Sequence, residues 1–254
     1  MKSLTAAVAA LAFTLAACES GPFSSSAPPV PTEAIEAALA APDRLETDVE
    51  RDASRHAAEL LAFTGVQPGD RVLDIGSLQG YMAWLFSGVV GREGAVTMQN
   101  PPVWWDNFES LPPAVGAVTA SRSNVSSSVT AFDNLEGASA SYDVVFAGLV
   151  YHDIAGMEVD RDAMNRQIYA LLRPGGAYVV TDHAAPTGSG LRDVRDRHRI
   201  DPAFVREEIE AAGFRYAGSL SVLDNPEDDL SLNVFDPAVR GATSQFGLRF
   251  VKPE

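Results

Sequence analysis

Short apolar segments alternate with segments of helical periodicity along most of this chain, and no other feature of the sequence limits its fold as strongly. Apolar runs typical of buried strands occupy residues 71–75, 95–99, 142–147, 177–181, 214–220 and 245–251, with a weaker one near 115–120. Helical spacing of apolar residues covers 32–39, 45–63, 81–87, 161–172 and 202–213. Strands separated by helices predict an α/β fold with a doubly wound, mostly parallel seven-stranded sheet, an N-terminal helical extension, and one domain over residues 32–254.

The start of the chain has the features of an export signal. Met1 and Lys2 precede an apolar run from Leu4 to Ala17, which is shorter than the roughly 20 residues that span a bilayer. Its length and small-residue ending predict a signal peptide over residues 1–17. The string Leu15-Ala16-Ala17-Cys18 resembles a bacterial lipobox, which implies that Cys18 is lipidated and becomes the new N-terminus.

A tether-like segment follows the cysteine. Residues 18–31 are rich in Ser, Pro, Gly and Ala, a composition typical of a flexible linker. We therefore expect an exported lipoprotein that faces the periplasm and contacts the membrane through its N-terminal lipid anchor only. Glu19 is not the aspartate that typically marks inner-membrane retention, which favours the outer membrane. An ordinary secretory signal with a chance cysteine remains the alternative.

Composition excludes several classes of protein. The chain has 34 acidic and 19 basic residues among 254, a formal net charge of -15, and such a surface repels phosphate backbones, so we expect no nucleic-acid partner. Its single cysteine excludes an intramolecular disulfide framework and a multi-cysteine metal site.

A glycine-bearing turn follows the first predicted strand, in the run Asp74-Ile75-Gly76-Ser77-Leu78-Gln79-Gly80. In open α/β sheets, ligands lie beyond the carboxyl ends of the strands, where such a turn lets the backbone approach them. Together with Gln67-Pro68-Gly69-Asp70, Asp143 at the start of an apolar strand, and Leu172-Arg173-Pro174-Gly175-Gly176 before another, this turn resembles class I S-adenosylmethionine-dependent methyltransferases. The resemblance covers roughly residues 45–254.

A narrower resemblance is to a bacterial family of predicted methyltransferases, through Gln99-Asn100-Pro101, Tyr151-His152-Asp153 and Asp182-His183. The resemblance implies the sheet order of the methyltransferase fold with an antiparallel last strand, S-adenosylmethionine as cofactor, and methyl transfer to an acceptor, a small molecule in our interpretation. The residues it assigns to the cofactor are Asp74, Gly76, Ser77, Gly80, Gln99 and Asn100.

Two residues depart from the methyltransferase pattern. Leu78 stands at the middle glycine position, where it adds a side chain and would be strained at a positive φ. Gln99 and Asn100 replace the acidic residue that usually binds the ribose hydroxyls, and amides form weaker hydrogen bonds than a carboxylate. The expected location adds a difficulty, because this polar cofactor is made inside the cell and crosses a bilayer only at high cost.

Three of the four histidines follow predicted strands or precede a helix. His152 and His183 come after neighbouring strands, so we expect them to converge on one pocket, whereas His56 lies in an early helix. In the methyltransferase interpretation, His152 or His183 is the general base, and Tyr151 and Asp182 face the acceptor.

Other interpretations stay open. His152, Asp153, Asp182 and His183 form a mixed nitrogen and oxygen ligand set for a metal-dependent enzyme on a scaffold that has lost its cofactor. A non-catalytic lipoprotein that binds a small molecule or a partner is a third hypothesis. The histidines could also be loop caps or ion-pair partners, as His198 beside Asp196.

Three further segments have weaker signals. Trp104 and Trp105 suit either an adenine platform or a packed lid on the core. Arg192, Arg195, Arg197 and Arg199 alternate with acids, which predicts an exposed mixed-charge face. Residues 121–130 are polar and predict a loop.

Overall fold

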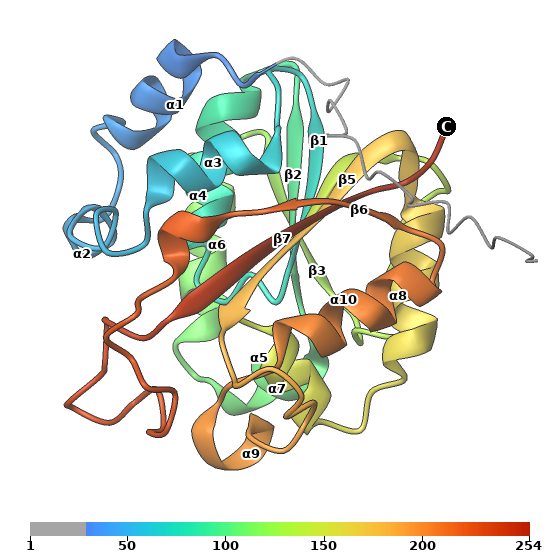
Figure 1. The fold of residues 1–254 in the computed structure, drawn as a ribbon. Helices are drawn as coiled ribbons and strands as arrows, with labels where there is room; N and C mark the ends of the chain where they lie inside the picture. Colours follow the sequence, from blue (N-terminus) through green and yellow to red (C-terminus); the bar gives the residue numbers. More distant parts are fainter. Residues whose placement is uncertain (1–28) are drawn as a thin grey trace, which may run out of the picture.

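The computed structural model describes residues 29–254, which fold around a single seven-stranded sheet with the order β3-β2-β1-β4-β5-β7-β6 (Figure 1). The strands are β1 (Arg71–Ile75), β2 (Ala95–Asn100), β3 (Val125–Val129), β4 (Tyr142–Gly148), β5 (Leu172–His183), β6 (Arg215–Ser219) and β7 (Gln245–Val251). Strands β1 to β5 pair in parallel, and β7 runs antiparallel between β5 and β6. The prediction of a doubly wound, mostly parallel sheet with an antiparallel last strand is confirmed.

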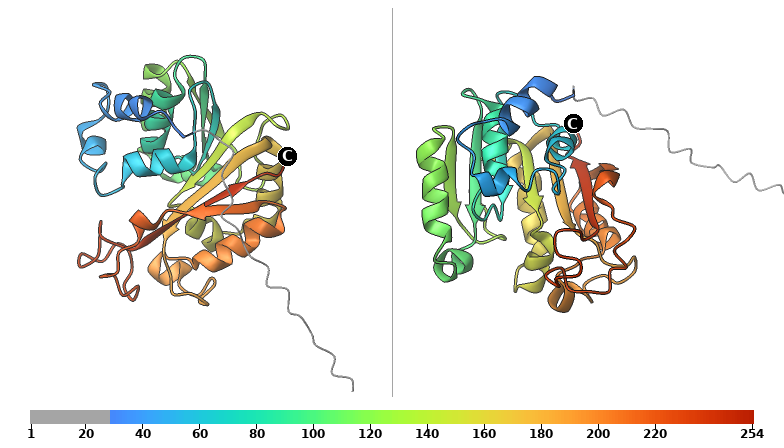
Figure 2. Two further views of the ribbon diagram at one scale, coloured as in Figure 1. Left: turned by 45° about the horizontal axis from the view of Figure 1, so that its top comes forward. Right: turned by 90° about the vertical axis from the view of Figure 1, so that its left-hand side faces the viewer.

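Helices cover both faces of the sheet (Figure 2). One face packs on α1 (Thr32–Leu39), α3 (Ala57–Thr64), α4 (Tyr81–Val90) and α6 (Leu111–Ser121). The other packs on α7 (Tyr151–Gly156), α8 (Arg161–Leu171) and α10 (Pro202–Ala211). Alternation along β1 explains the two cores, because Val72 belongs to the first and Leu73 to the second.

Short elements complete the structure: α2 (Glu46–Val49), α5 (Pro102–Asn107), α9 (Val194–Arg197) and the 3-10 turn η1 (Ser221–Leu223). Within residues 29–254, no helix has the length and apolar character that crossing a membrane requires. The predicted signal peptide, Cys18 and most of the predicted linker lie outside the described residues.

The prediction for residues 115–130 is wrong. Residues 115–120, predicted as a strand, belong to α6, whose buried Leu111, Val115 and Val118 recur at helical spacing. Strand β3 lies instead in the polar segment predicted as a loop. It is an edge strand paired only with β2 among the described strands, so its serines face solvent without burying a polar group.

The predicted helix over residues 45–63 is interrupted. Its pieces are α2 and α3, which are separated by turns that end at His56 with a φ of 48°. Arg44 binds both carboxylate oxygens of Asp52 at 2.6 Å, and Asp52 accepts a hydrogen bond from the Tyr81 hydroxyl at 2.8 Å. The N-terminal extension is thereby fastened to the first residue of α4, beside the glycine-bearing turn.

One arginine of the predicted exposed face is buried. The Arg199 side chain is fully enclosed, forms an ion pair with Asp228 at 2.9 Å, and donates to the carbonyl oxygens of Leu232 and Ala184. The guanidinium has enough donors to satisfy several acceptors at once, which makes its burial tolerable. Arg199 therefore fastens the long segment between η1 and β7 to the end of β5.

Candidate active site at the glycine-bearing turn

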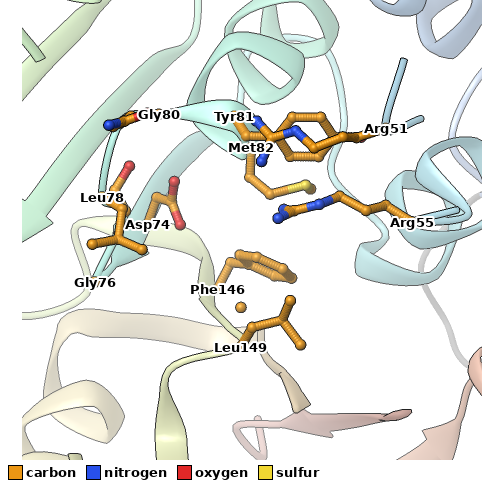
Figure 3. A pocket seen from close by; sticks show the side chains of 13 residues that line it. Arg51, Arg55, Asp74, Gly76, Leu78, Gly80, Tyr81, Met82, Phe146 and Leu149 are labelled. Atoms are coloured by element: carbon orange, nitrogen blue, oxygen red, sulfur yellow. The ribbon is translucent and has the colours of Figure 1, made fainter. Parts of the chain in front are cut away.

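The turn between β1 and α4 borders a cavity of about 200 Å³ (Figure 3). Gly76 and Gly80 have φ values of 60° and 92°, a region that favours glycine. A Cβ at Gly76 would also lie 2.5 Å from the Val150 side chain, and one at Gly80 would lie 2.7 Å from Met98. The residues that line the cavity are Arg51, Arg55, Asp74, Gly76, Ser77, Leu78, Gln79, Gly80, Tyr81, Met82, Phe146, Gly148 and Leu149.

Asp74 ends β1 with a buried carboxylate at the cavity wall. Its side chain is 2% exposed, and no described residue forms a hydrogen bond with its Oδ2 or with Oγ of Ser77. Burial raises the pKa of Asp74 to about 7. Within residues 29–254, Oδ2 of Asp74 and Oγ of Ser77 therefore lack a well-formed hydrogen bond and border a hollow, which is typical of a ligand site.

Gln99 and Asn100 lie behind the turn and are not among the cavity-lining residues. Gln99 Oε1 accepts from the Gly76 amide at 3.1 Å, and its Nε2 donates to the Thr130 carbonyl at 2.6 Å. Asn100 accepts from the Leu78 amide at 2.8 Å and donates to the Leu78 carbonyl at 3.3 Å. Both amides are 1% exposed. They position the turn, in contrast to the direct cofactor contact expected from the sequence, because an amide supplies both the donor and the acceptor that a peptide group needs.

Two leucines at the cavity have left-handed backbone conformations. Leu78 has a φ of 50° and a side chain that is 42% exposed, so the strain expected at this position is present. Leu149, which the sequence analysis did not single out, has a φ of 55°. Its amide donates to the Thr181 carbonyl at 2.7 Å. Such conformations cost about 1 to 2 kcal/mol per non-glycine residue.

Two arginines close the cavity from the N-terminal extension, opposite the turn (Figure 3). Arg51 forms an ion pair with Asp48. The Arg55 guanidinium lies 4.5 Å from the centre of the Tyr81 ring, and no carboxylate of residues 29–254 forms an ion pair with it. Burial lowers the pKa of Arg55. Sequence analysis missed both, because charged residues on a predicted helix over residues 45–63 look like its ordinary exposed face.

A second, more apolar recess continues the cavity. It has a volume of about 30 Å³ and shares Arg55, Tyr81, Met82, Phe146, Gly148 and Leu149 with the first. Its other lining residues are Leu60, Thr181, Leu223 and Gln245. The two hollows together run from the turn to the ends of β5 and β7.

The rings of His152 and His183 lie near each other, with their centres 5.9 Å apart. Asp182 is fully buried between them, and it accepts from the two histidine amides at 2.7 Å and contacts His152 Nδ1 at 2.6 Å. His152 borders a separate open cavity with Asp153 and His198. Neither His152, His183 nor Asp182 lines the cavity at the turn, which differs from the general-base position expected from the sequence.

The pKa values of the two imidazoles are shifted in opposite directions. Burial lowers the pKa of His152, but the carboxylates of Asp182 and Asp153 outweigh it and raise the pKa above its ordinary value. Burial lowers the pKa of His183 to about 4, and its Nδ1 lies 2.8 Å from the Thr243 hydroxyl. His183 is therefore neutral at physiological pH, whereas His152 favours the protonated form more than an ordinary histidine.

Tyr151 belongs to the packed interior, and Trp104 is partly buried against it. Tyr151, predicted to line the acceptor pocket, is fully buried, donates to Glu208 at 3.0 Å and accepts from Asn165 at 2.9 Å. Trp104 packs edge-on against Phe132 with ring centres 5.5 Å apart. The first turn of α7 directs Tyr151 into the core, and Trp104 has the lid role that the sequence left open.

Comparisons with known proteins agree with this architecture. A family model described as Protein-L-isoaspartate(D-aspartate) O-methyltransferase matches residues 34–107, under a third of the chain. No curated protein matches the sequence significantly. Among solved structures, a SAM-dependent methyltransferase from Aquifex aeolicus is 16% identical, with a TM-score of 0.55, over 76% of this chain and 87% of that one.

Two other structures have similar scores. Fibrillarin from Aeropyrum pernix, in complex with S-adenosyl-L-methionine, is 17% identical over 79% of this chain and 76% of that one, with a TM-score of 0.50. The fold is that of the S-adenosylmethionine-dependent methyltransferases. The [4+2]-cyclase SpnF shares it at 20% identity and a TM-score of 0.56, over 78% of this chain and 82% of that one, so the fold alone does not fix the reaction.

The raised pKa of Asp74 predicts a pH-dependent cost to stability. Between about pH 4 and 7 the carboxyl group is ionised in the unfolded chain but protonated in the folded one, so the free energy of unfolding falls by roughly 1.4 kcal/mol per pH unit as pH rises. Asp74→Asn removes the titrating carboxyl group and with it this loss of stability. In denaturant unfolding, the free energy of unfolding of the variant relative to that of the wild type should rise by roughly 2 to 3 kcal/mol between pH 5 and pH 7. Asp106→Asn, at an exposed carboxylate, is the matched control. A stability difference between Asp74→Asn and the wild type that is the same at both pH values would contradict the assignment.

Proposed function

We propose that this chain is an S-adenosylmethionine-dependent methyltransferase with a small-molecule acceptor. The fold supports this function, and the family match at residues 34–107 includes the glycine-bearing turn. The cavity lies at the carboxyl ends of β1 and β4, where the strand order reverses and where open α/β sheets bind their ligands.

The observation that carries the proposal is the placement of acceptor oxygens and a guanidinium on opposite sides of the cavity. Asp74 and Ser77 present unpartnered oxygens on one side, and Arg55 presents a guanidinium without a carboxylate partner among the described residues on the other. The amino-acid end of S-adenosylmethionine carries an ammonium and a carboxylate group. In this arrangement Asp74 and Ser77 receive the ammonium group and Arg55 the carboxylate, with charge-assisted hydrogen bonds. Gln99 and Asn100 hold the turn in place.

The apolar recess is the proposed acceptor site. When bound, the cofactor supplies an electrophilic methyl group, and the protein aligns the acceptor for in-line attack. Leu60, Phe146 and Leu223 provide apolar contact there. Arg55 and Tyr81 are the titratable groups among the described residues that line the recess, and burial raises the pKa of Tyr81 well above its ordinary value. Since no carboxylate or imidazole of residues 29–254 lines it, an amine or thiolate acceptor suits the recess better than an alcohol that needs a strong base.

Calorimetric titration with S-adenosylmethionine and with its demethylated product tests the cofactor assignment. We expect Arg55→Gln to weaken binding by about tenfold or more, because a hydrogen bond to a charged group contributes about 1.5 to 3 kcal/mol. Arg51→Gln is the matched control, since Arg51 is already paired with Asp48, and it should have a smaller effect. Absence of binding heat at high protein concentration, or equal losses in the two variants, would contradict the proposal.

Leu78→Gly tests whether the strained leucine limits access to the turn. Removing its exposed side chain lets backbone approach the ligand, and binding of S-adenosylmethionine should tighten by roughly threefold or more. Leu230→Gly is the control, because Leu230 also has a positive φ, of 63°, but does not line the cavity. Both variants relieve left-handed strain, so both should raise the free energy of unfolding, and only the affinity for S-adenosylmethionine distinguishes them. An unchanged affinity in Leu78→Gly would contradict the proposal that this leucine limits access to the turn.

We also propose, from the sequence features of residues 1–31, that the protein is exported and anchored through lipidated Cys18. In labelled-palmitate incorporation followed by cell fractionation, the wild type should carry label and sediment with membranes. Cys18→Ala should lose both properties. A wild type that is unlabelled and cytosolic would overturn the export proposal and remove the difficulty of cofactor supply.

A further inference from the structure

We propose that the chain holds a zinc-type divalent cation at a second site, formed by His152, Asp153 and His198. One nitrogen from each imidazole and one carboxylate oxygen lie within 4.8 Å of one another. His152 Nε2 is 3.3 Å from Asp153 Oδ1, and His198 Nδ1 is 3.7 Å from the same oxygen. This cluster shares no lining residue with the cavity at the glycine-bearing turn.

The separations agree with tetrahedral coordination. Zinc binds nitrogen and carboxylate oxygen at about 2.0 to 2.2 Å, and tetrahedral angles then place neighbouring ligand atoms about 3.3 to 3.6 Å apart. The distances from Asp153 Oδ1 to the two imidazole nitrogens are close to this range. Two imidazoles and a carboxylate suit zinc-type cations, whereas magnesium and calcium prefer sites made of oxygen ligands.

Asp182 orients His152 for this role. It lies 2.6 Å from His152 Nδ1, and a carboxylate there favours the tautomer with the proton on Nδ1, so that Nε2, which lies 3.3 Å from Asp153 Oδ1, is the nitrogen that would bind a cation. Asp182 is itself fixed by the backbone amides of His152 and His183 at 2.7 Å. A carboxylate that bonds the far nitrogen of a ligating histidine is the usual support around bound zinc.

His198 is held in a strained conformation beside His152. Its φ is 53°, in the left-handed region that costs a non-glycine residue free energy. Its ring packs edge-on against Phe235 and His152, with centres 5.0 and 5.5 Å apart. The next residue, Arg199, is fastened to Asp228 by the buried ion pair. Strain that surrounding structure maintains at a chemically active side chain indicates function.

The site has room for a further ligand. The three residues border an open cavity of about 360 Å³, whose rim includes Met157 and the exposed Arg195. Three protein ligands with an open fourth position are typical of catalytic rather than structural zinc sites. We expect water or a small ligand with an oxygen donor to complete the coordination.

This ligand set differs from the metal alternative in the sequence analysis. Asp182 acts on His152 Nδ1 instead of facing the cation, and His183 directs its Nδ1 to Thr243. His198 replaces Asp182 and His183 as a ligand. Its proximity to His152 was not predictable from the sequence, because the two residues are far apart along the chain. The site does not depend on S-adenosylmethionine, so failure of cofactor binding would leave it intact.

Zinc titration of the full chain tests the proposal. The protein is prepared without a polyhistidine tag, stripped with chelator, and titrated with Zn²⁺ against a competing dye. We expect one high-affinity equivalent, and we expect His198→Ala and Asp153→Asn each to weaken it by at least about tenfold. Excess Mg²⁺ should not compete. His198 and Asp153 have side chains that are 34% and 35% exposed, so neither substitution opens the core, and far-UV circular dichroism verifies folding.

His56→Ala is the matched control, because His56 forms a half-exposed pair with Glu59 at 3.9 Å on the N-terminal extension. It should leave zinc affinity unchanged. X-ray absorption of the zinc-loaded protein should show two imidazole ligands. No stoichiometric binding by the wild type, or affinity that falls equally in His56→Ala and His198→Ala, would overturn the site.

Discussion

The side-chain amides at the end of β2 determine the shape of the turn on which the first site depends. Gln99 and Asn100 bond the backbone of Gly76 and Leu78, and both are shielded from water. Buried hydrogen bonds of this kind are costly to break, because each leaves an unsatisfied group in the interior. They hold Leu78 in its left-handed conformation and keep the turn beside Asp74. Gln99 and Asn100 stand at the positions where the methyltransferase pattern has a residue that contacts the cofactor. In this chain they instead support the glycine-bearing turn.

The parallel sheet brings both sites to one edge. Strands β1 and β4 are neighbours with Asp74 opposite Phe146, and β4 pairs next with β5. The first cavity lies between the ends of β1 and β4, and the histidine cluster lies at the ends of β4 and β5. Neighbouring parallel strands thus bring the two groups of residues on which our proposals depend to the same edge of the sheet.

Much of the fold was predictable from local patterns. Strands such as residues 71–75 and 142–147 are mostly apolar because most of their residues are buried, on both faces of the sheet. Strand β3 was not predicted because an edge strand can be polar. Part of α6 was predicted as a strand because the spacing of apolar residues in a short stretch fits the period of a strand as well as that of a helix. In the site, Asp74 and the glycines followed from the motif. Arg55, Leu149 and the pairing of His198 with His152 depend on how distant segments pack, which no local pattern records.

The hydrogen bond from Leu149 to Thr181 joins the two sites through a very short path. Leu149 borders the first cavity, and His152 lies three residues further along the chain; Thr181 precedes Asp182, which orients His152. One backbone hydrogen bond therefore connects a residue that borders the first cavity to the residue before the carboxylate that contacts His152. The two sites are thus separated by a few covalent bonds and one hydrogen bond, although their lining residues do not overlap.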